Sequence, residues 1–513
     1  PLYPAAVRAN GPDSGQWYLR APQGAVVSSI DIEAAWARTQ GSAGVVVAVL
    51  DTGVRFDHPD LGRAAQGGRL LPGYDFVSDS DVGNDGNGRD GDPSDPGDWT
   101  TAAENSNRNG KFYQCDSGGT GAAVATASSW HGTKTASLVG AATGNGQGMA
   151  GAAPGVSVLP LRVLGKCFGN DSDIQAAMLW AAGISVDGVP DNANPAKVIN
   201  LSLGGSGACT AAYQSVINQV LARGAVVVAA AGNSAGGPVS TPGNCSGVVT
   251  VLALRHVGTK VGFSDLGPEI TIAAPGGNCV NTSGACLYPI LAATNTGAQG
   301  PVGSAWSDSF DITVGTSFSS PLVAGVVGLM FSQSPGLTPA QVRTALQFTA
   351  RPFPTTGADN GADPTAVPQC RAPSSNVEQL QCYCSTAFCG AGMLDAGAAV
   401  AAVAATSNVV ARITVATATP TAGSPVELTS GTSSSSGRNI VGWNWQLIDG
   451  GGIVSAFGSA TNAASATLTP NGAGSFSVRL TVTDDAGALA SADQAVTVAA
   501  APVVATPNTP SSG

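Results

Sequence analysis

The chain has 513 residues, of which 11% are charged, with a formal net charge of −11 and a pI near 4.6. Because nucleic-acid binding requires clustered Lys and Arg, this balance excludes a generally basic nucleic-acid binder. No apolar run approaches the roughly 18 residues that cross a bilayer, so we expect no membrane span. Hydrophobic residues make up 43% of the chain, enough to bury a sizeable core.

Short apolar runs alternate with helical patterns through the first half of the chain. The apolar runs predict buried strands over residues 44–51, 156–164, 197–203 and 225–231. The stretches between them predict helices over residues 131–142, 172–182 and 211–223. Wholly apolar strands that alternate with helices are typical of a parallel sheet covered on both faces. We therefore predict a doubly wound α/β domain with its functional residues at the carboxyl ends of the strands.

The pattern changes after an Ala-rich helical stretch at residues 395–406. Six short alternating segments follow, which predict a small all-β sandwich domain. These segments cover residues 413–415, 426–428, 440–447, 465–468, 475–482 and 494–498. The last residues are rich in Pro, Ser, Thr and Asn, which predicts disorder. The predicted organisation is an α/β domain over residues 1–406, a β-sandwich over 407–499 and a disordered tail over 500–513.

Ten cysteines fit five disulfides and an oxidising compartment, so we expect a secreted, extracellular protein. The competing interpretation is a metal site. Cys382, Cys384 and Cys389 contain no Cys-x-x-Cys pair and have no His nearby, which argues against zinc. The sequence alone leaves the disulfide connectivity open.

Three polar segments carry the residue types of a nucleophilic enzyme. Asp51 ends the first predicted strand, His131 begins a helix of small residues, and Ser317 precedes an apolar helix. A serine nucleophile needs a base, and the base needs a buried acid that fixes its tautomer. The other histidines, His58 and His256, lie in a turn-like segment and after a strand. The order acid, base, serine excludes an esterase of the α/β-hydrolase type, in which the serine comes first.

Together these segments resemble the motifs of the subtilisin-like serine proteases, the subtilase family, over roughly residues 16–402. Asp51-Thr-Gly-Val with His58-Pro-Asp-Leu resembles the aspartate motif, and His131-Gly-Thr the histidine motif. Gly-Thr-Ser317, followed by a proline four residues later, resembles the serine motif. Val-Val-Ala-Ala-Ala-Gly-Asn233 resembles the strand that delivers the oxyanion asparagine.

The resemblance implies a secreted serine endopeptidase. It makes Ser317 the nucleophile, His131 the general base and Asp51 the orienting carboxylate. Asn233 would stabilise the oxyanion together with the backbone N–H of Ser317. The alternative is a non-catalytic binding protein on a degenerate subtilase fold. Lys134 departs from the family motif; because it lies three residues after His131 on one helix face, we expect its charge to lower the pKa of His131.

The resemblance also implies the substrate contacts. The pocket for the residue before the scissile bond would have one wall from 202–204 and a facing wall from 231–232. The segment 164–169 resembles an edge that pairs with an extended peptide. The resulting substrate-binding residues are Ser202, Leu203, Gly204, Ala231, Gly232, Gly165 and Phe168. Because these segments contain no acidic residue, we expect broad specificity for proteins or peptides, without a preference for Lys or Arg.

Residues 78–98 hold seven Asp among Gly, Asn and Pro. Carboxylates this dense repel one another unless a hard cation binds them, and many subtilases carry calcium. We predict a structural calcium site with Asp85, Asp90, Asp92 and Asp95 as ligands, against the alternative of a solvated acidic loop. Asp60 is expected at a second calcium site near the N-terminus.

Analogy with disulfide-bearing secreted bacterial subtilases implies the pairs Cys115–Cys167, Cys209–Cys245 and Cys279–Cys286. It leaves Cys370–Cys382 and Cys384–Cys389 as the remaining pairs.

The second domain resembles the PKD-type Ig-like module, on Val-Gly-Trp443-Asn-Trp445 and on residues 477–485. It is either a spacer or a module that docks on insoluble protein. Trp443 and Trp445 lie two apart on a strand and face the same way, one over the core and the other at its rim. We expect a monomer.

Overall fold

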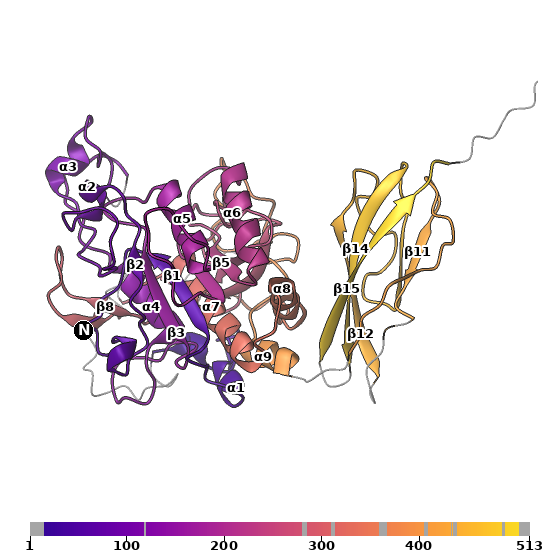
Figure 1. The fold of residues 1–513 in the computed structure, drawn as a ribbon, viewed down its shortest axis with the longest axis horizontal. Helices are drawn as coiled ribbons and strands as arrows, with labels where there is room; N and C mark the ends of the chain where they lie inside the picture. Colours follow the sequence, from indigo (N-terminus) through magenta and orange to yellow (C-terminus); the bar gives the residue numbers. More distant parts are fainter. Residues whose placement is uncertain are drawn as a thin grey trace, which may run out of the picture. The chain divides into compact units, whose positions relative to one another are not determined.

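The computed structural model describes residues 15–116, 119–279, 285–308, 313–358, 367–404, 409–431, 433, 439–484 and 488–501. The predicted domain boundary at 406/407 and the predicted tail beyond residue 501 lie outside the described residues. The chain divides into two compact units, Pro1–Ala401 and Ala402–Gly513 (Figure 1). No helix in the described ranges is long and apolar enough to cross a membrane.

A seven-stranded parallel sheet forms the centre of the first unit, in the order β2-β3-β1-β4-β5-β6-β7. Its strands are β1 (Val46–Asp51), β2 (Tyr74–Asp75), β3 (Ser157–Arg162), β4 (Val198–Leu201), β5 (Val226–Ala230), β6 (Val249–Leu254) and β7 (Ile270–Pro275). All strands except the short β2 are buried along their whole length. This explains their near-continuous apolar sequences and confirms the predicted α/β fold.

Helices cover both faces of this sheet (Figure 1). Val46, Ala48 and Leu50 of β1 pack with apolar side chains of α5 and α6, whereas α4 and α7 pack against the opposite face. The helices are α1 (Ile32–Trp36), α2 (Ser80–Gly83), α3 (Ala102–Ser106), α4 (His131–Gly140), α5 (Asp171–Ala181), α6 (Ala211–Ala222), α7 (Thr316–Gln333), α8 (Pro339–Phe348) and α9 (Ala396–Ala404). A separate hairpin consists of β8 (Ala293–Asn295) and β9 (Ser304–Trp306).

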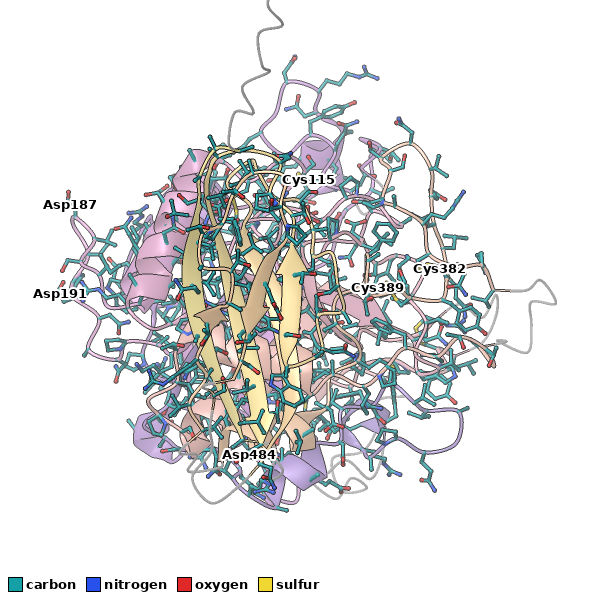
Figure 2. All side chains as sticks on the ribbon, turned by 90° about the vertical axis from the view of Figure 1, so that its right-hand side faces the viewer. Cys115, Asp187, Asp191, Cys382, Cys389 and Asp484 are labelled. Atoms are coloured by element: carbon teal, nitrogen blue, oxygen red, sulfur yellow. A yellow bond between two sulfur atoms is a disulfide. The ribbon has the colours of Figure 1, made fainter. Side chains whose placement is uncertain are left out.

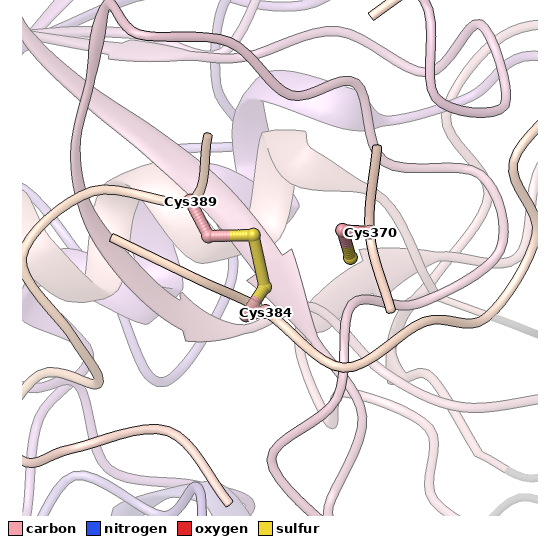
Figure 3. A group of neighbouring side chains, drawn as sticks. All are labelled: Cys370, Cys384 and Cys389. Carbon is pink, nitrogen blue, oxygen red and sulfur yellow. A yellow bond between two sulfur atoms is a disulfide. The ribbon is translucent and has the colours of Figure 1, made fainter. Parts of the chain in front are cut away.

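All five predicted disulfides are confirmed. The bonds are Cys115–Cys167, Cys209–Cys245, Cys279–Cys286, Cys370–Cys382 and Cys384–Cys389. Cys370 lies beside the Cys384–Cys389 bond, and the sulfur atoms of these three residues lie within 4.8 Å of one another (Figure 3). Because each sulfur is already bonded to another cysteine, this cluster offers no thiolate to a metal.

The second unit contains two three-stranded antiparallel sheets, β10-β11-β13 and β12-β14-β15. Their strands are β10 (Thr414–Val415), β11 (Val426–Thr429), β12 (Ile440–Asp449), β13 (Ser465–Leu468), β14 (Gly474–Asp484) and β15 (Leu489–Val498). The sandwich prediction is therefore confirmed. The last strand begins five residues earlier than predicted, because its Leu-Ala-Ser-Ala-Asp start has no β-branched residue to mark it.

Both tryptophans of β12 face the core of this unit. Trp445 is buried and its Nε1 donates to the Ala463 carbonyl at 2.9 Å, while Trp443 is half-buried against the same core. This is the predicted arrangement of one core and one rim tryptophan. It leaves little exposed aromatic surface for docking.

Candidate active site

A cavity of about 540 Å³ opens at the carboxyl ends of β1, β4 and β5, and His131, Asn233 and Ser317 all line it. These strands are neighbours in the sheet. Parallel strands end at the same edge, so the sequence segments that follow them meet there. Asp51, the last residue of β1, lies buried beside His131.

Asp51 is held by hydrogen bonds on both carboxylate oxygens. Its Oδ1 lies 2.7 Å from His131 Nδ1 and accepts the N–H of Thr52 at 2.8 Å. Its Oδ2 accepts the hydroxyl of Thr135, one helical turn after His131, at 3.1 Å. A carboxylate fixed this way holds the proton on Nδ1 and leaves Nε2 as the basic nitrogen.

The start of α4 sets the position of His131. Gly132 follows it because a Cβ there would collide with the carbonyl oxygen of Gly53 in the loop after β1. The N–H of His131 donates to Ser129 Oγ at 3.2 Å, and Asp98 accepts both the N–H and the hydroxyl of Ser129 at 2.6 Å. Asp98 therefore anchors the residues that lead into the helix.

Burial lowers the pKa of His131, but the charge and hydrogen bond of Asp51 raise it, Lys134 lowers it and Asp98 raises it. The balance leaves the pKa above its usual value. Lys134 lowers this pKa, as predicted, but the expected net result of a pKa below its usual value is wrong. The carboxylate in direct contact outweighs an ammonium one helical turn away.

Ser317 is the second residue of α7 and half-buried at the cavity wall. Its Oγ donates to the Ser202 carbonyl at 3.1 Å. To act as a nucleophile, the hydroxyl must turn from this carbonyl towards the imidazole. Such catalytic hydrogen bonds are often absent before substrate binds.

Asn233 is oriented by Thr316, the residue before Ser317. Its Oδ1 accepts both the N–H and the hydroxyl of Thr316, each at 3.0 Å. The same hydroxyl accepts the N–H of Gly232 at 3.2 Å. With Oδ1 engaged, the Nδ2 group of Asn233 is the part of the amide left to donate into the cavity.

Five of the seven predicted substrate-binding residues line the cavity: Ser202, Leu203, Gly204, Gly165 and Phe168. The other two, Ala231 and Gly232, do not. Ala231 is fully buried, and its backbone pairs with Val251 and Ser240. These backbone hydrogen bonds hold the segment that leads from β5 to Asn233.

The segment 164–169 forms a tight turn, which corrects the prediction of an extended edge. The N–H of Gly165 donates to the Phe168 carbonyl at 3.1 Å, and Cys167 has a φ of 70°. The Cys115–Cys167 disulfide joins this turn to the segment that follows α3. A turned backbone of this kind does not present a free strand edge for pairing.

Sequence reasoning missed several residues of the site. Thr52 and Thr316 lie inside the recognised motifs, so their adjacency to Asp51 and Ser317 was a usable signal. Asp98 and Asp171 also line the cavity. Asp98 belongs to the aspartate-rich segment 78–98 but nothing there links it to the cavity, and nothing in the local sequence marks Asp171, because both positions depend on how distant segments pack.

The predicted calcium ligands do not converge. Asp85 accepts Arg162 Nη1 at 2.5 Å, and the same nitrogen reaches buried Asp75 at 2.6 Å. The guanidinium thus supplies the positive charge that calcium was predicted to supply. Asp90 and Asp92 accept hydrogen bonds from their own loop.

Asp95 and Asp60 are likewise engaged by protein donors. Asp95 is buried and accepts the hydroxyl of Thr52 at 2.7 Å; burial and the nearby Asp98 charge raise its pKa to about 7. Asp60 is buried and accepts N–H groups of Asn145, Met149 and Trp306. Within the described ranges, no three carboxylate or imidazole side chains gather closely enough to hold one ion. The four ligands predicted for one site therefore do not gather at a common point, and Asp60, predicted at a second site, is bound by protein donors.

The subtilase family model matches residues 42–369. The chain belongs to the subtilase family. Its PKD domain, matched over residues 417–498, follows the subtilase unit.

This subtilase is 42% identical over 391 residues to the extracellular protease of Xanthomonas campestris pv. campestris, covering 76% of this chain and 56% of that protein. It is 38% identical over 361 residues to the extracellular basic protease of Dichelobacter nodosus, covering 68% and 54%. The chain therefore spans about half the length of these two relatives. A solved structure described as proteases from Pseudoalteromonas arctica PAMC 21717 shares 39% identity and a TM-score of 0.62, over 77% of this chain and 98% of that one.

Proposed function

We propose that this subtilase is a secreted serine endopeptidase that hydrolyses peptide bonds in proteins. The observation that carries the proposal is the 2.7 Å contact between Asp51 and His131 on the cavity that also holds Ser317 and Asn233. An acid, a base, a nucleophile and an amide donor at one cavity are the groups that acyl transfer requires.

In this proposal His131 Nε2 removes the Ser317 proton as Oγ attacks the scissile carbonyl carbon. The resulting oxyanion accepts hydrogen bonds from Asn233 Nδ2 and from the N–H of Ser317, where the N-terminus of α7 also favours negative charge. The imidazolium then protonates the leaving amine, and the peptide bond breaks. Water, deprotonated by His131, releases the acyl group and restores Ser317.

The test is hydrolysis of a quenched fluorescent peptide by the wild-type chain and by Ser317→Ala. We expect Ser317→Ala to lose nearly all turnover while keeping the melting curve of the wild type. Near-normal turnover in this variant rejects the proposal. Tight peptide binding without hydrolysis by the wild type would support the alternative of a binding protein on a subtilase fold.

Secretion and substrate are parts of the same proposal. Five disulfides suit an oxidising compartment, and two relatives are described as extracellular proteases. The walls formed by residues 202–204 carry no charge, which supports cleavage after many residue types rather than after Lys or Arg. A cleavage profile on a peptide library measures this directly.

Two further parts of the proposal are a structural role for calcium and a docking role for the PKD domain. Calcium is frequent among subtilases, and we propose a structural calcium ion for this chain. A melting temperature lowered by a chelator and restored by calcium would support a structural ion. For the PKD domain, deletion after residue 401 should leave small-peptide hydrolysis intact, and loss of adsorption to insoluble protein would support a docking role.

A further inference from the structure

The lining of the cavity also includes Asp171, Ile174 and Tyr213, none of which has a role in the proposed mechanism. Asp171 is the first residue of α5, and Tyr213 lies in the first turn of α6. Asp171 Oδ1 accepts the phenol hydroxyl of Tyr213 at 2.8 Å. This hydrogen bond holds the Asp171 carboxylate in place at the wall of the cavity.

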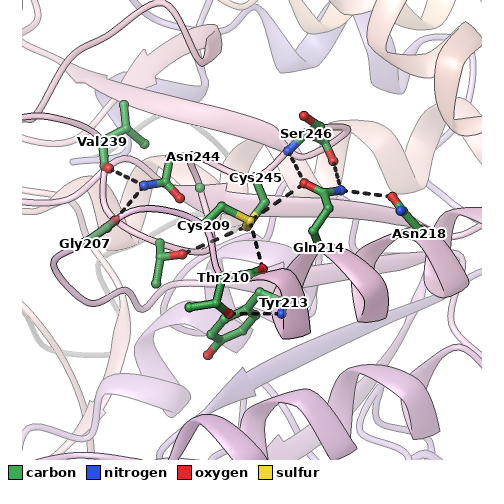
Figure 4. Close-up of a disulfide and its surroundings, with 12 residues drawn as sticks. Gly207, Cys209, Thr210, Tyr213, Gln214, Asn218, Val239, Asn244, Cys245 and Ser246 are labelled. Carbon is green, nitrogen blue, oxygen red and sulfur yellow. Dashed lines mark hydrogen bonds between the residues drawn. A yellow bond between two sulfur atoms is a disulfide. The ribbon is translucent and has the colours of Figure 1, made fainter.

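Tyr213 is itself well anchored. The hydroxyl of Thr210 accepts the N–H of Tyr213 at 3.2 Å, and the Cys209–Cys245 disulfide holds the residue before this cap (Figure 4). The ring is buried in the core between α5 and α6. Burial and Asp171 together hold the pKa of Tyr213 above its usual value, so the phenol remains a hydrogen-bond donor.

In the described part of the cavity wall, Asp171 has no lysine or arginine beside it. Among the described residues that line the cavity there are two carboxylates, Asp98 and Asp171, and no lysine or arginine. Lys166, in the adjoining turn, pairs with Glu104 at 2.7 Å.

The two carboxylates differ in what their oxygens do. Both oxygens of Asp98 accept hydrogen bonds from Ser129, so this carboxylate already holds the residues that lead into α4. Asp171 is exposed, and its Oδ2 has no protein partner among the described residues. Asp171 is therefore the carboxylate available to a ligand.

We propose that Asp171 is a specificity-determining residue that recognises a cationic side chain of the substrate, Lys or Arg, on the N-terminal side of the scissile bond. The proposal rests on the proposed peptidase function. Residues 202–204, the proposed wall of the pocket for the residue before the scissile bond, line the same cavity as Gly205, Thr241 and Tyr213, and Gly205 pairs with Thr241 through backbone hydrogen bonds. The site is distinct from that uncharged pocket, and it selects a residue further upstream.

The experiment compares pairs of peptides that differ only by arginine or its neutral analogue citrulline, placed in turn at each position on both sides of the cleaved bond. For each enzyme the measured quantity is the ratio of kcat/KM for the two peptides. We expect the wild type to favour arginine about fivefold at one upstream position, the upper range for an exposed ion pair. Asp171→Asn should bring that ratio close to one.

The matched control is Asp187→Asn, which removes the same charge from the exposed loop after α5, outside the cavity (Figure 2). It should keep the wild-type ratio. Raising the salt concentration should reduce the ratio in the wild type and not in Asp171→Asn. Circular dichroism of each variant verifies folding.

A wild-type ratio near one at every upstream position overturns the proposal, as does a preference that persists in Asp171→Asn. Loss of the preference in Asp98→Asn alone would overturn it as well, by moving the recognition to the other carboxylate. Binding of the same peptides to Ser317→Ala, followed by fluorescence anisotropy, gives the arginine preference without catalysis. Failure to cleave any peptide, together with an intact binding preference, would reject the peptidase function and not this inference.

Discussion

Asp51 and the aspartates of residues 78–98 belong to the same unit but have different electrostatic partners. Asp51 receives its hydrogen bonds from Thr52, Thr135 and His131, all of which belong to or adjoin the sequence motifs. The acidic segment is instead balanced by distant cations. Lys111 reaches Asp79 and Asp81, and Arg162 at the end of β3 reaches Asp85.

This comparison shows that a high density of carboxylates in a sequence does not by itself predict a metal ion. Repulsion among carboxylates requires positive charge, but the sequence does not say whether an ion or a side chain supplies it. Arg162 is almost fully buried and lies 77 residues from Asp85 in the chain.

The largest expected effect is that of Asp51→Asn. The amide no longer fixes the required imidazole tautomer, so kcat should fall by about 10⁴-fold, as this change does in serine protease triads. Steady-state kinetics with an unchanged melting curve would assign the loss to catalysis. A loss below tenfold would mean that Asp51 does not orient the base.

Asn233→Ala should lower kcat by about 10²–10³-fold and leave KM nearly unchanged, because the oxyanion forms only on the way to the tetrahedral state. Thr316→Val removes the hydroxyl that holds Asn233 Oδ1 but keeps the backbone N–H. It should give a smaller fall in kcat in the same direction. An effect confined to KM in both variants argues against the oxyanion role.

Arg162→Met should destabilise the fold by about 3–5 kcal/mol, the usual result of removing one partner from a buried ion pair. Asp75 and Asp85 would then face each other without a cation. Lys111→Met is the control, because it removes an exposed cation that pairs with an aspartate of the same segment, residues 78–98. Urea denaturation should show a large loss for the first and little change for the second. Equal midpoints would contradict the role assigned to Arg162.

The smallest effect concerns pH. Because the pKa of His131 lies above its usual value, activity should already fall as the pH drops through that raised pKa, since the base must be neutral. Lys134→Gln removes a charge that lowers this pKa, so the acid limb of kcat/KM should move upward by a fraction of a pH unit. Lys197→Gln, at the residue just before β4 and outside the cavity lining, serves as the charge-matched control. An unmoved limb means that Lys134 does not act on His131.

Most of the fold could be predicted because each local pattern agreed with the final structure. The strands around Asp51, Ser202 and Asn233 are apolar along their length, and short polar motifs follow them. The positions of Ala231 and Gly232 behind the cavity could not be predicted, since a motif does not tell which face of a loop meets solvent. Asp98 and Asp171 were missed because packing of separate loops and helices brings them to the cavity.

The most direct test of the central claim is covalent labelling by a fluorophosphonate, with the modified residue located by mass spectrometry. The account predicts one label per chain on Ser317, formed faster as the pH rises through the pKa of His131, and no label in Ser317→Ala. A folded wild-type chain that takes up no label, or takes it up at another serine, would contradict the assignment of Ser317 as an activated nucleophile.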